Sequence, residues 1–136
     1  MKRCAILYAL LVSFCARPGA QEIKIKEIYR RTITADYTRY EYVFSVTNNT
    51  RDRLNLFIDV NLLDSSKNII DTRFLNFETP EGSTETGSIE SDYAPTVSDT
   101  SGTTASFYKL SIRDSGRNKA YEVEGTLNVP VIHKQG

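Results

Sequence analysis

Strict alternation of apolar and polar residues in two neighbouring segments constrains this chain more than any other feature. In 39–47 the even positions are Tyr40, Tyr42, Phe44 and Val46, and the positions between them are mostly polar. In 54–63 leucine, isoleucine or valine occupies every even position. Successive side chains of a β-strand point to opposite faces, so each segment predicts a strand with one buried face. One-sided strands are typical of antiparallel sheets, because strands of a doubly covered parallel sheet are apolar throughout.

Five further segments carry strand signals between groups of turn-forming residues. They are 23–33, 69–77, 83–89, 105–113 and 121–129. The alternation changes phase after Ile25, which predicts a β-bulge, and Gly125 interrupts an apolar row, which predicts a bulge or a close contact. About seven short strands without a helical segment indicate an all-β fold, an immunoglobulin-like antiparallel β-sandwich. The two clearest strands either pair directly or lie in different sheets.

The first twenty residues have the pattern of an export signal. A basic start precedes a thirteen-residue apolar run at 4–16, and turn formers and a small residue follow it. This pattern predicts a secretory signal peptide over 1–20, cleaved between Ala20 and Gln21. A single β-sandwich domain over 21–136 would then be secreted, or lie in the periplasm or cell envelope. The apolar run is shorter than the about 20 residues of a transmembrane helix, so no span is predicted in the mature chain.

Two alternatives for this segment stay open. An uncleaved signal would anchor the chain in a membrane. A lipid on Cys15 would tether it to a membrane surface, although Phe14 stands where lipoproteins carry a small residue.

Charge and cysteine content restrict the function of the mature chain. The whole chain has 17 basic and 17 acidic residues, and removal of 1–20 would leave 14 against 17, a net charge of −3. A nucleic-acid partner is therefore disfavoured. Both cysteines lie within 1–20, so the mature domain would have no disulfide and no cysteine-based metal site.

The residues needed for catalysis are scarce. The single histidine, His133, lies near the end of the chain, where we expect a fraying tail rather than a catalytic base. No Gly-x-Ser-x-Gly elbow or glycine-rich phosphate loop occurs. Asp92 and Asp99 share a loop, but the spacing of a calcium loop is missing. We therefore predict no enzyme activity, no cofactor and no metal site.

Two consecutive segments resemble the FxLYD group of bacterial extracellular domains. Val46–Thr50 reads VTNNT, and the next strand ends at Val60–Asp64 as VNLLD before a polar turn and Ile69–Ile70. Leu62 and Asp64 match the Phe-x-Leu-Tyr-Asp signature, whereas Val60 and Leu63 replace its Phe and Tyr. The resemblance covers about 40–77. It implies a secreted or cell-envelope accessory domain and no reaction. Independently, the Asp64 carboxylate is placed to bond its own downstream backbone and start the turn.

The candidate binding residues lie on a long connection and outside the regular apolar rows. Segment 90–104 has no strand pattern, so it is either a contact loop or a mobile crossover. Tyrosine offers a large rigid surface and a hydroxyl group for recognition. The candidates are Tyr29, Tyr37, Asp92, Tyr93 and Asp99. Tyr40, Tyr42 and Tyr108 lie on apolar rows and are expected in the core. Arg30, Arg31 and Arg39 form either a solvated basic end or an anion site.

These features favour a non-enzymatic binding or accessory module that contacts another envelope or extracellular protein through loops or sheet edges. One specific mechanism is strand addition to an exposed edge at Ser83–Ile89. The alternative is a self-associating structural component of the cell envelope or surface. Segment 48–50 (NNT) is also a formal glycosylation acceptor in a eukaryotic host.

Overall fold

The computed structural model describes residues 21–134, and these contain eight β-strands. The strands are β1 (Gln21–Thr34), β2 (Tyr37–Asn48), β3 (Leu54–Leu63), β4 (Ile69–Thr79), β5 (Thr84–Ser91), β6 (Phe107–Asp114), β7 (Lys119–Thr126) and β8 (Val131–Lys134). Among these residues no helix has the length and hydropathy to cross a membrane. The predicted signal peptide and the possible lipid site at Cys15 lie outside the described residues.

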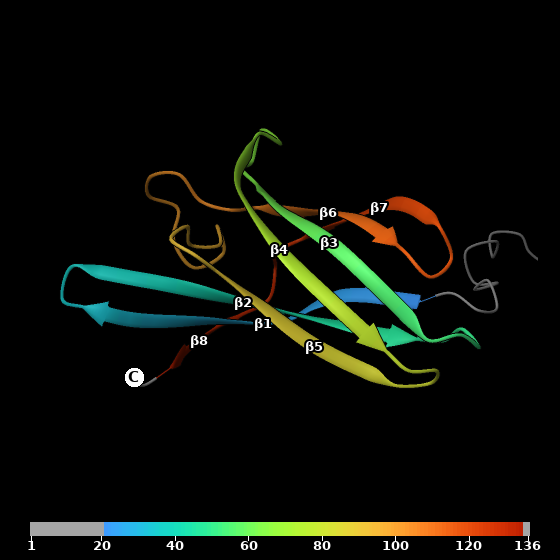
Figure 1. The fold of residues 1–136 in the computed structure, drawn as a ribbon. Coiled ribbons are helices and arrows are strands. Elements are labelled where there is room, and N and C mark those ends of the chain that lie inside the picture. The colour runs from blue at the N-terminus through green and yellow to red at the C-terminus, as the bar shows by residue number, and fades with distance from the viewer. Residues whose placement is uncertain (1–20, 135–136) are drawn as a thin grey trace, which may run out of the picture.

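The strands form two four-stranded sheets in the orders β5-β2-β1-β8 and β4-β3-β6-β7 (Figure 1). The chain crosses from one sheet to the other between β2 and β3, so the two most regular strands do not pair with each other. It crosses back between β4 and β5. In constant-type immunoglobulin domains the fourth strand pairs with the fifth, whereas here β4 stays beside β3. The predicted immunoglobulin-like sandwich is confirmed with this variation.

The C-terminal end differs from the prediction. The last predicted strand, 121–129, ends at Thr126, and the chain then crosses to the other sheet, where β8 pairs in parallel with residues 28–31 of β1. Residues 21–134 therefore contain eight strands, and among their strand pairs the one between β1 and β8 is parallel. His133 lies in β8 rather than in a fraying tail. Leu127 is 1 % exposed and Val131 packs against the core, so burial of these two side chains holds the crossover in place.

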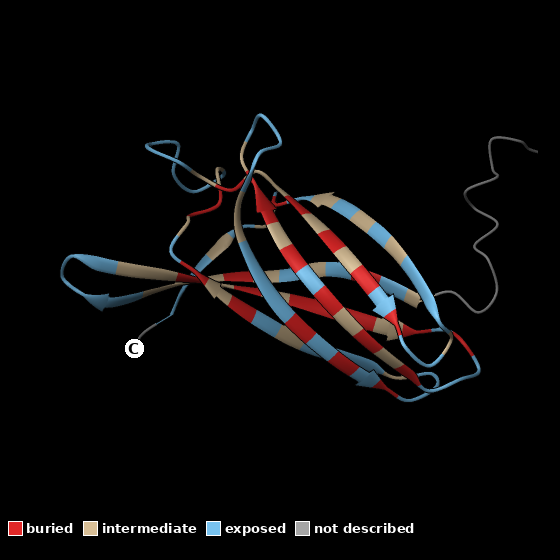
Figure 2. Ribbon diagram, turned by 45° about the horizontal axis from the view of Figure 1, so that its top comes forward, coloured by how far each residue is buried: buried red, intermediate tan, exposed pale blue. Residues whose placement is uncertain are grey.

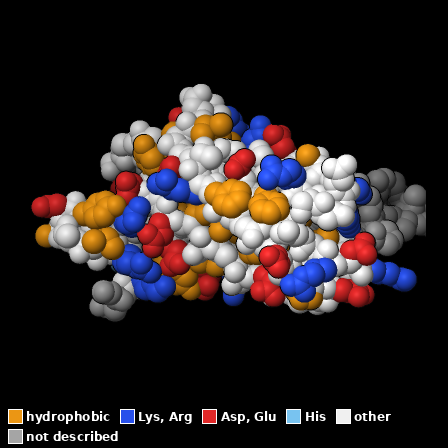
Figure 3. All heavy atoms as spheres, in the orientation of Figure 1, with side chains coloured by type: hydrophobic (Ala, Val, Ile, Leu, Met, Phe, Trp, Pro, Cys, Tyr) orange, Lys and Arg blue, Asp and Glu red, His pale blue; other side chains and the backbone are white. Residues whose placement is uncertain are grey.

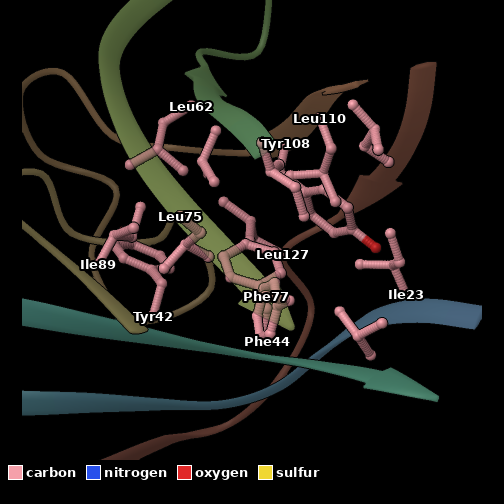
Figure 4. Packing of buried hydrophobic residues seen from close by; sticks show 14 of the residues in the cluster. Ile23, Tyr42, Phe44, Leu62, Leu75, Phe77, Ile89, Tyr108, Leu110 and Leu127 are labelled. Carbon is pink, nitrogen blue, oxygen red and sulfur yellow. The ribbon is translucent and has the colours of Figure 1, made fainter. Parts of the chain in front are cut away.

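The core lies between the two sheets and comes from the alternating positions. Buried and exposed residues follow one another along the strands in Figure 2. Tyr42 of β2 and Leu62 of β3 point into the same core (Figure 4), and Phe44 meets Tyr108 edge-on across the sheets, with ring centroids 5.3 Å apart. Tyr40, Tyr42 and Tyr108 are buried as predicted.

Three local predictions are confirmed. The register of β1 against β2 shifts between Ile25 and Glu27, as expected for a bulge. Gly125 lies under Tyr108, because a Cβ atom there would fall 2.4 Å from the tyrosine hydroxyl oxygen. The Asp64 carboxylate accepts hydrogen bonds from the backbone N–H groups of Asn68 (2.9 Å) and Ser66 (3.0 Å), which hold the pKa of Asp64 below its usual value.

Candidate functional site at the hairpin end

Three segments that are distant in sequence meet at one end of the sandwich. They are residues 30–40 at the tip of the β1–β2 hairpin, the connection from β5 to β6 at 92–106, and residues 128–134 around β8. Figure 1 shows the hairpin tip, this connection and the C-terminal strand on the same side of the molecule. We call this region the hairpin end.

Hydrogen bonds fix the base of the long connection. Pro95 and Ala105 form a β-bridge, and the Thr96 N–H donates to the Ala105 carbonyl oxygen at 2.8 Å. The Thr96 hydroxyl lies 2.7 Å from the hydroxyl oxygens of both Thr104 and Ser106. The hydroxyl residues of this segment therefore bond to one another, and the tip at 97–103 is presented from a fixed base.

On the outer face of the β5-β2-β1-β8 sheet, Tyr37 and Asp92 are directly bonded. The Tyr37 hydroxyl donates to Asp92 at 2.9 Å, and this bond to a carboxylate raises the tyrosine pKa. Arg39 lies 3.6 Å from Asp92 and 3.0 Å from Glu90, and Arg31 lies 3.2 Å from Glu90. Arg31 and Arg39 are therefore paired with carboxylates, and of the predicted basic cluster only Arg30 faces elsewhere.

The same face continues to Tyr29 along β1. Its hydroxyl donates to Glu27 at 2.8 Å, which raises the pKa of Tyr29. The Lys134 ammonium group lies 4.9 Å from the centre of the Tyr29 ring and 3.3 Å from Glu41. Burial alone would raise the pKa of Glu41. Hydrogen bonds from Ser88 and Lys134, with the charges of Lys134 and Arg31, outweigh burial and lower it.

A hollow of about 550 Å³ opens on the other side of the hairpin, beneath the long connection. Its walls include Arg30, Tyr40, Val97, Asp99 and His133. The Arg30 guanidinium lies 3.4 Å from His133 Nδ1. Because guanidinium can only donate, Arg30 is the donor and Nδ1 the acceptor when the two groups form a hydrogen bond.

A second hollow of about 470 Å³ adjoins the first and shares Arg30, Tyr40 and Asp99 with it. Asp92 and Tyr93 lie on its wall. The Asp99 carboxylate accepts hydrogen bonds from the Ser101 hydroxyl (2.7 Å) and N–H (2.8 Å), and these bonds, with the nearby charge of Arg30, lower its pKa.

Four of the five predicted binding residues therefore lie at the hairpin end, whereas Tyr29 lies apart from the two hollows. Sequence reasoning missed Arg30 and His133 as neighbours, and it assigned Tyr40 to the core alone. One signal could have placed His133, because Val131 and Ile132 are β-branched residues typical of a strand. Arg30 and Tyr40 lie opposite each other because of the register of β1 against β2. The sequence does not specify this register.

Within residues 21–134, no three His, Cys, Asp or Glu side chains gather as metal ligands would. Asp92 bonds to Tyr37, and Asp99 bonds to Ser101 within its own turn. The walls of the two hollows carry the guanidinium group of Arg30, three carboxylates (Asp36, Asp92 and Asp99) and the exposed side chain of Val97.

Comparison of the sequence with family models and with curated proteins gives no match, so the FxLYD resemblance stays a prediction. Among solved structures, a β-glucuronidase from glycoside hydrolase family 2 aligns over 80 % of this chain and 11 % of its own, with 12 % identity and a TM-score of 0.45. A Listeria innocua β-glucosidase in complex with glucose aligns over 84 % and 16 %, at 12 % identity and a TM-score of 0.41. A candidate ApaA protein from Bordetella pertussis aligns over 84 % and 97 %, at 9 % identity and a TM-score of 0.43.

The chain thus spans a small part of each glycosidase and nearly all of the Bordetella protein. At these identities and TM-scores, the likenesses say nothing about what this chain binds or whether it catalyses a reaction.

Proposed function

We propose that this chain is a secreted or periplasmic, non-enzymatic binding module that contacts another envelope or extracellular protein. The supporting observation is the meeting of three distant segments around Arg30, where two hollows share Arg30, Tyr40 and Asp99. Arginine and tyrosine contribute strongly to protein interfaces because they combine apolar area with hydrogen-bonding groups. Fixed loops on a rigid sandwich are also a common place for recognition.

The hairpin end suits an extended segment of a partner protein. The guanidinium group of Arg30 would bind a carboxylate or carbonyl group of that segment. The exposed side chain of Val97, at 52 %, would pack against an apolar residue. The Asp99 carboxylate would accept a backbone or side-chain N–H group.

Capture from an envelope extract tests this proposal. The exported protein is compared with Arg30→Glu and with Arg51→Glu, which reverses an exposed charge in the β2–β3 connection at the opposite end. We expect a partner to be captured by the parent and by Arg51→Glu but to be lost with Arg30→Glu. Equal capture by both variants would show that binding does not use the hairpin end.

The edge of β5 offers a second contact mode, strand addition. Within the described residues, β2 is the only strand that pairs with β5. On the other edge of β5 the Glu90 carbonyl oxygen accepts from Arg73 of β4, whereas residues 84–88 pair with no second strand. The Asn48 N–H donates to the Ser83 carbonyl oxygen, so Asn48 and Ser83 form a hydrogen-bonded pair of the β2–β5 ladder. Along an antiparallel ladder, such pairs alternate with pairs whose backbone groups do not bond to each other. The pairs that are not hydrogen-bonded include Thr84, Thr86 and Ser88 of β5. The backbone N–H and C=O groups of these residues point away from β2. They could pair with an added strand.

The same open edge also supports the alternative function, self-association of this chain as a structural component. Edge strands with unpaired backbone groups readily pair with identical strands of a second molecule. Sedimentation over a range of concentrations distinguishes the two functions. If the chain stays monomeric at high concentration, this result argues against the structural role and favours the binding module.

A further inference from the structure

A second surface with ligand-binding character lies on the outer face of the β4-β3-β6-β7 sheet, away from the hairpin end. Phe57 of β3 and Phe74 of β4 lie side by side there, with ring centroids 6.3 Å apart and planes inclined by 27°. Phe74 is 58 % exposed. Figure 3 shows hydrophobic side chains in the middle of this face, between charged side chains. The two rings form a nearly flat apolar platform, although alternation places polar residues at most outward positions.

Three polar side chains around the platform have no hydrogen-bonding or ion-pair side-chain partner among residues 21–134. Most of the face is built from cross-strand pairs, such as Asn55 with Asn76 at 3.1 Å and Lys109 with Glu122 at 3.5 Å. In contrast, no hydrogen bond or ion pair within the described residues joins Asp59, Ser111 or Arg113 to another side chain. Their hydrogen-bonding capacity is free for a ligand.

These groups surround one hollow. It has a volume of about 410 Å³, and Phe57, Asp59, Phe74, Ser111 and Arg113 lie on its walls. This volume lies within the range of small-molecule sites, about 300–1,000 Å³. The Arg113 guanidinium lies 5.2 Å from the centre of the Phe57 ring. This cation–π contact holds the guanidinium beside the platform while its outer N–H groups stay available.

We propose that this platform binds an uncharged carbohydrate, and the proposal does not depend on the function of the hairpin end. A sugar ring presents C–H groups on its flat faces, and their partial positive charge suits the negative face of an aromatic ring. Its hydroxyl groups both donate and accept hydrogen bonds. Asp59 can only accept and Arg113 can only donate, so a set of neighbouring hydroxyls satisfies both groups.

Other ligand classes fit this platform less well. A wholly apolar partner would remove Asp59 and Arg113 from water without replacing their hydrogen bonds, which costs free energy. An anionic ligand would gain from Arg113 but would be repelled by Asp59 and Glu122. A cationic ligand would gain from Asp59 but would be repelled by Arg113. Glu122 is paired with Lys109, so the charges of Asp59 and Arg113 balance around the hollow, and a neutral ligand that bears hydroxyl groups meets no net repulsion.

Saturation-transfer NMR against a panel of oligosaccharides tests the proposal. The panel contains neutral glucose and N-acetylglucosamine oligomers, acidic uronic-acid oligomers and phenol as an apolar aromatic probe. We expect at least one neutral oligomer to bind, with saturation strongest on the C–H protons of one ring face. Phe74→Ala should weaken this binding at least about tenfold, the equivalent of 1.4 kcal/mol. Asp59→Asn should weaken it as well, because it replaces a carboxylate with a weaker acceptor.

Ile69→Ala is the matched control, because Ile69 lies on the same strand and is 59 % exposed. It should leave the affinity within about twofold, and circular dichroism should show all variants folded. Three results would overturn the proposal. No neutral oligomer binds at about 10 mM, or only the acidic oligomers or phenol bind, or Phe74→Ala binds as well as Ile69→Ala.

Discussion

Asn48 shows how one buried polar residue organises an end of this sandwich. Its side-chain amide donates to the carbonyl oxygens of Asp52 and Thr79, both at 2.8 Å. Its side-chain oxygen accepts from the N–H (2.9 Å) and hydroxyl (2.6 Å) of Thr50. These bonds join the end of β2 to the following turn and to the end of β4. Asn48 is 0 % exposed, so the folded domain offers no glycosylation acceptor at this residue.

Replacement of Asn48 should therefore destabilise the fold strongly. In Asn48→Ala the buried Thr50 N–H and the Thr79 carbonyl oxygen lose their bonds to Asn48, whereas the Asp52 carbonyl oxygen keeps the Thr50 hydroxyl at 3.0 Å. One unsatisfied buried group alone costs about 1–3 kcal/mol. We expect the free energy of unfolding in urea to fall by at least about 2 kcal/mol. Asn49→Ala, at the exposed neighbouring position, should change it by less than about 0.5 kcal/mol. Similar losses in both variants would contradict this role.

At the scale of elements, the alternation of β2, β3 and β6 could be predicted because one face of each is buried against the opposite sheet. The pairing of β8 with β1 could not be predicted, because the β-branched Val131 and Ile132 indicate a strand but a four-residue pattern does not specify its neighbour. The predicted strand at 69–77 does not by itself place Phe74 beside Phe57, since a sequence does not show that two aromatic residues of different strands lie side by side.

The β5 edge allows a matched pair of proline substitutions. Thr86 lies opposite Ser45 and Glu85 opposite Val46. By the alternation of the ladder, the Glu85 N–H bonds to β2 and the Thr86 N–H points to the open edge. Proline removes that N–H group. We therefore expect Thr86→Pro to keep a cooperative thermal transition and to lose partner binding or self-association, whereas Glu85→Pro unfolds at a clearly lower temperature.

If Thr86→Pro keeps the fold and binds its partner as the parent does, strand addition at β5 is the wrong mechanism. If the two variants are destabilised equally, the alternation of backbone directions along β5 is wrong.

At the scale of the whole molecule, the two long sides of the sandwich differ. Polar contacts join the edges at β4 and β5, where the Arg73 guanidinium donates to the Glu90 carbonyl oxygen at 2.9 Å and the Ser91 hydroxyl to Asp71 at 2.6 Å. On the other side, the chain itself crosses between the sheets from β7 to β8. The hairpin end brings together residues that are distant in sequence, such as Tyr37 and Asp92, which are 55 positions apart. Such pairings depend on the complete topology, so the sequence could nominate Tyr37 and Asp92 separately but not as a bonded pair.

The charge network on the outer face makes stability depend on acid pH. Glu41 lies 3.5 Å from Arg31 and 3.3 Å from Lys134, and its pKa in the fold is below the ordinary value of 4.5. The unfolded chain therefore binds a proton at Glu41 more readily than the folded chain does. The resulting stabilisation is fully present above about pH 4.5 and is lost as the pH falls through the folded pKa.

Glu41→Gln should remove this contribution. At pH 7 we expect the variant to be less stable than the parent by up to about 1 kcal/mol, the scale of a partly exposed ion pair. The difference should shrink as the pH falls through the folded pKa of Glu41, because the parent then loses this charge as well. Urea unfolding at a series of pH values measures both curves, with Glu85→Gln, at an exposed position, as the control. A difference that is the same at pH 3 and pH 7 would mean that Glu41 acts through packing, and the charge network would then contribute nothing to the stability of the sheet.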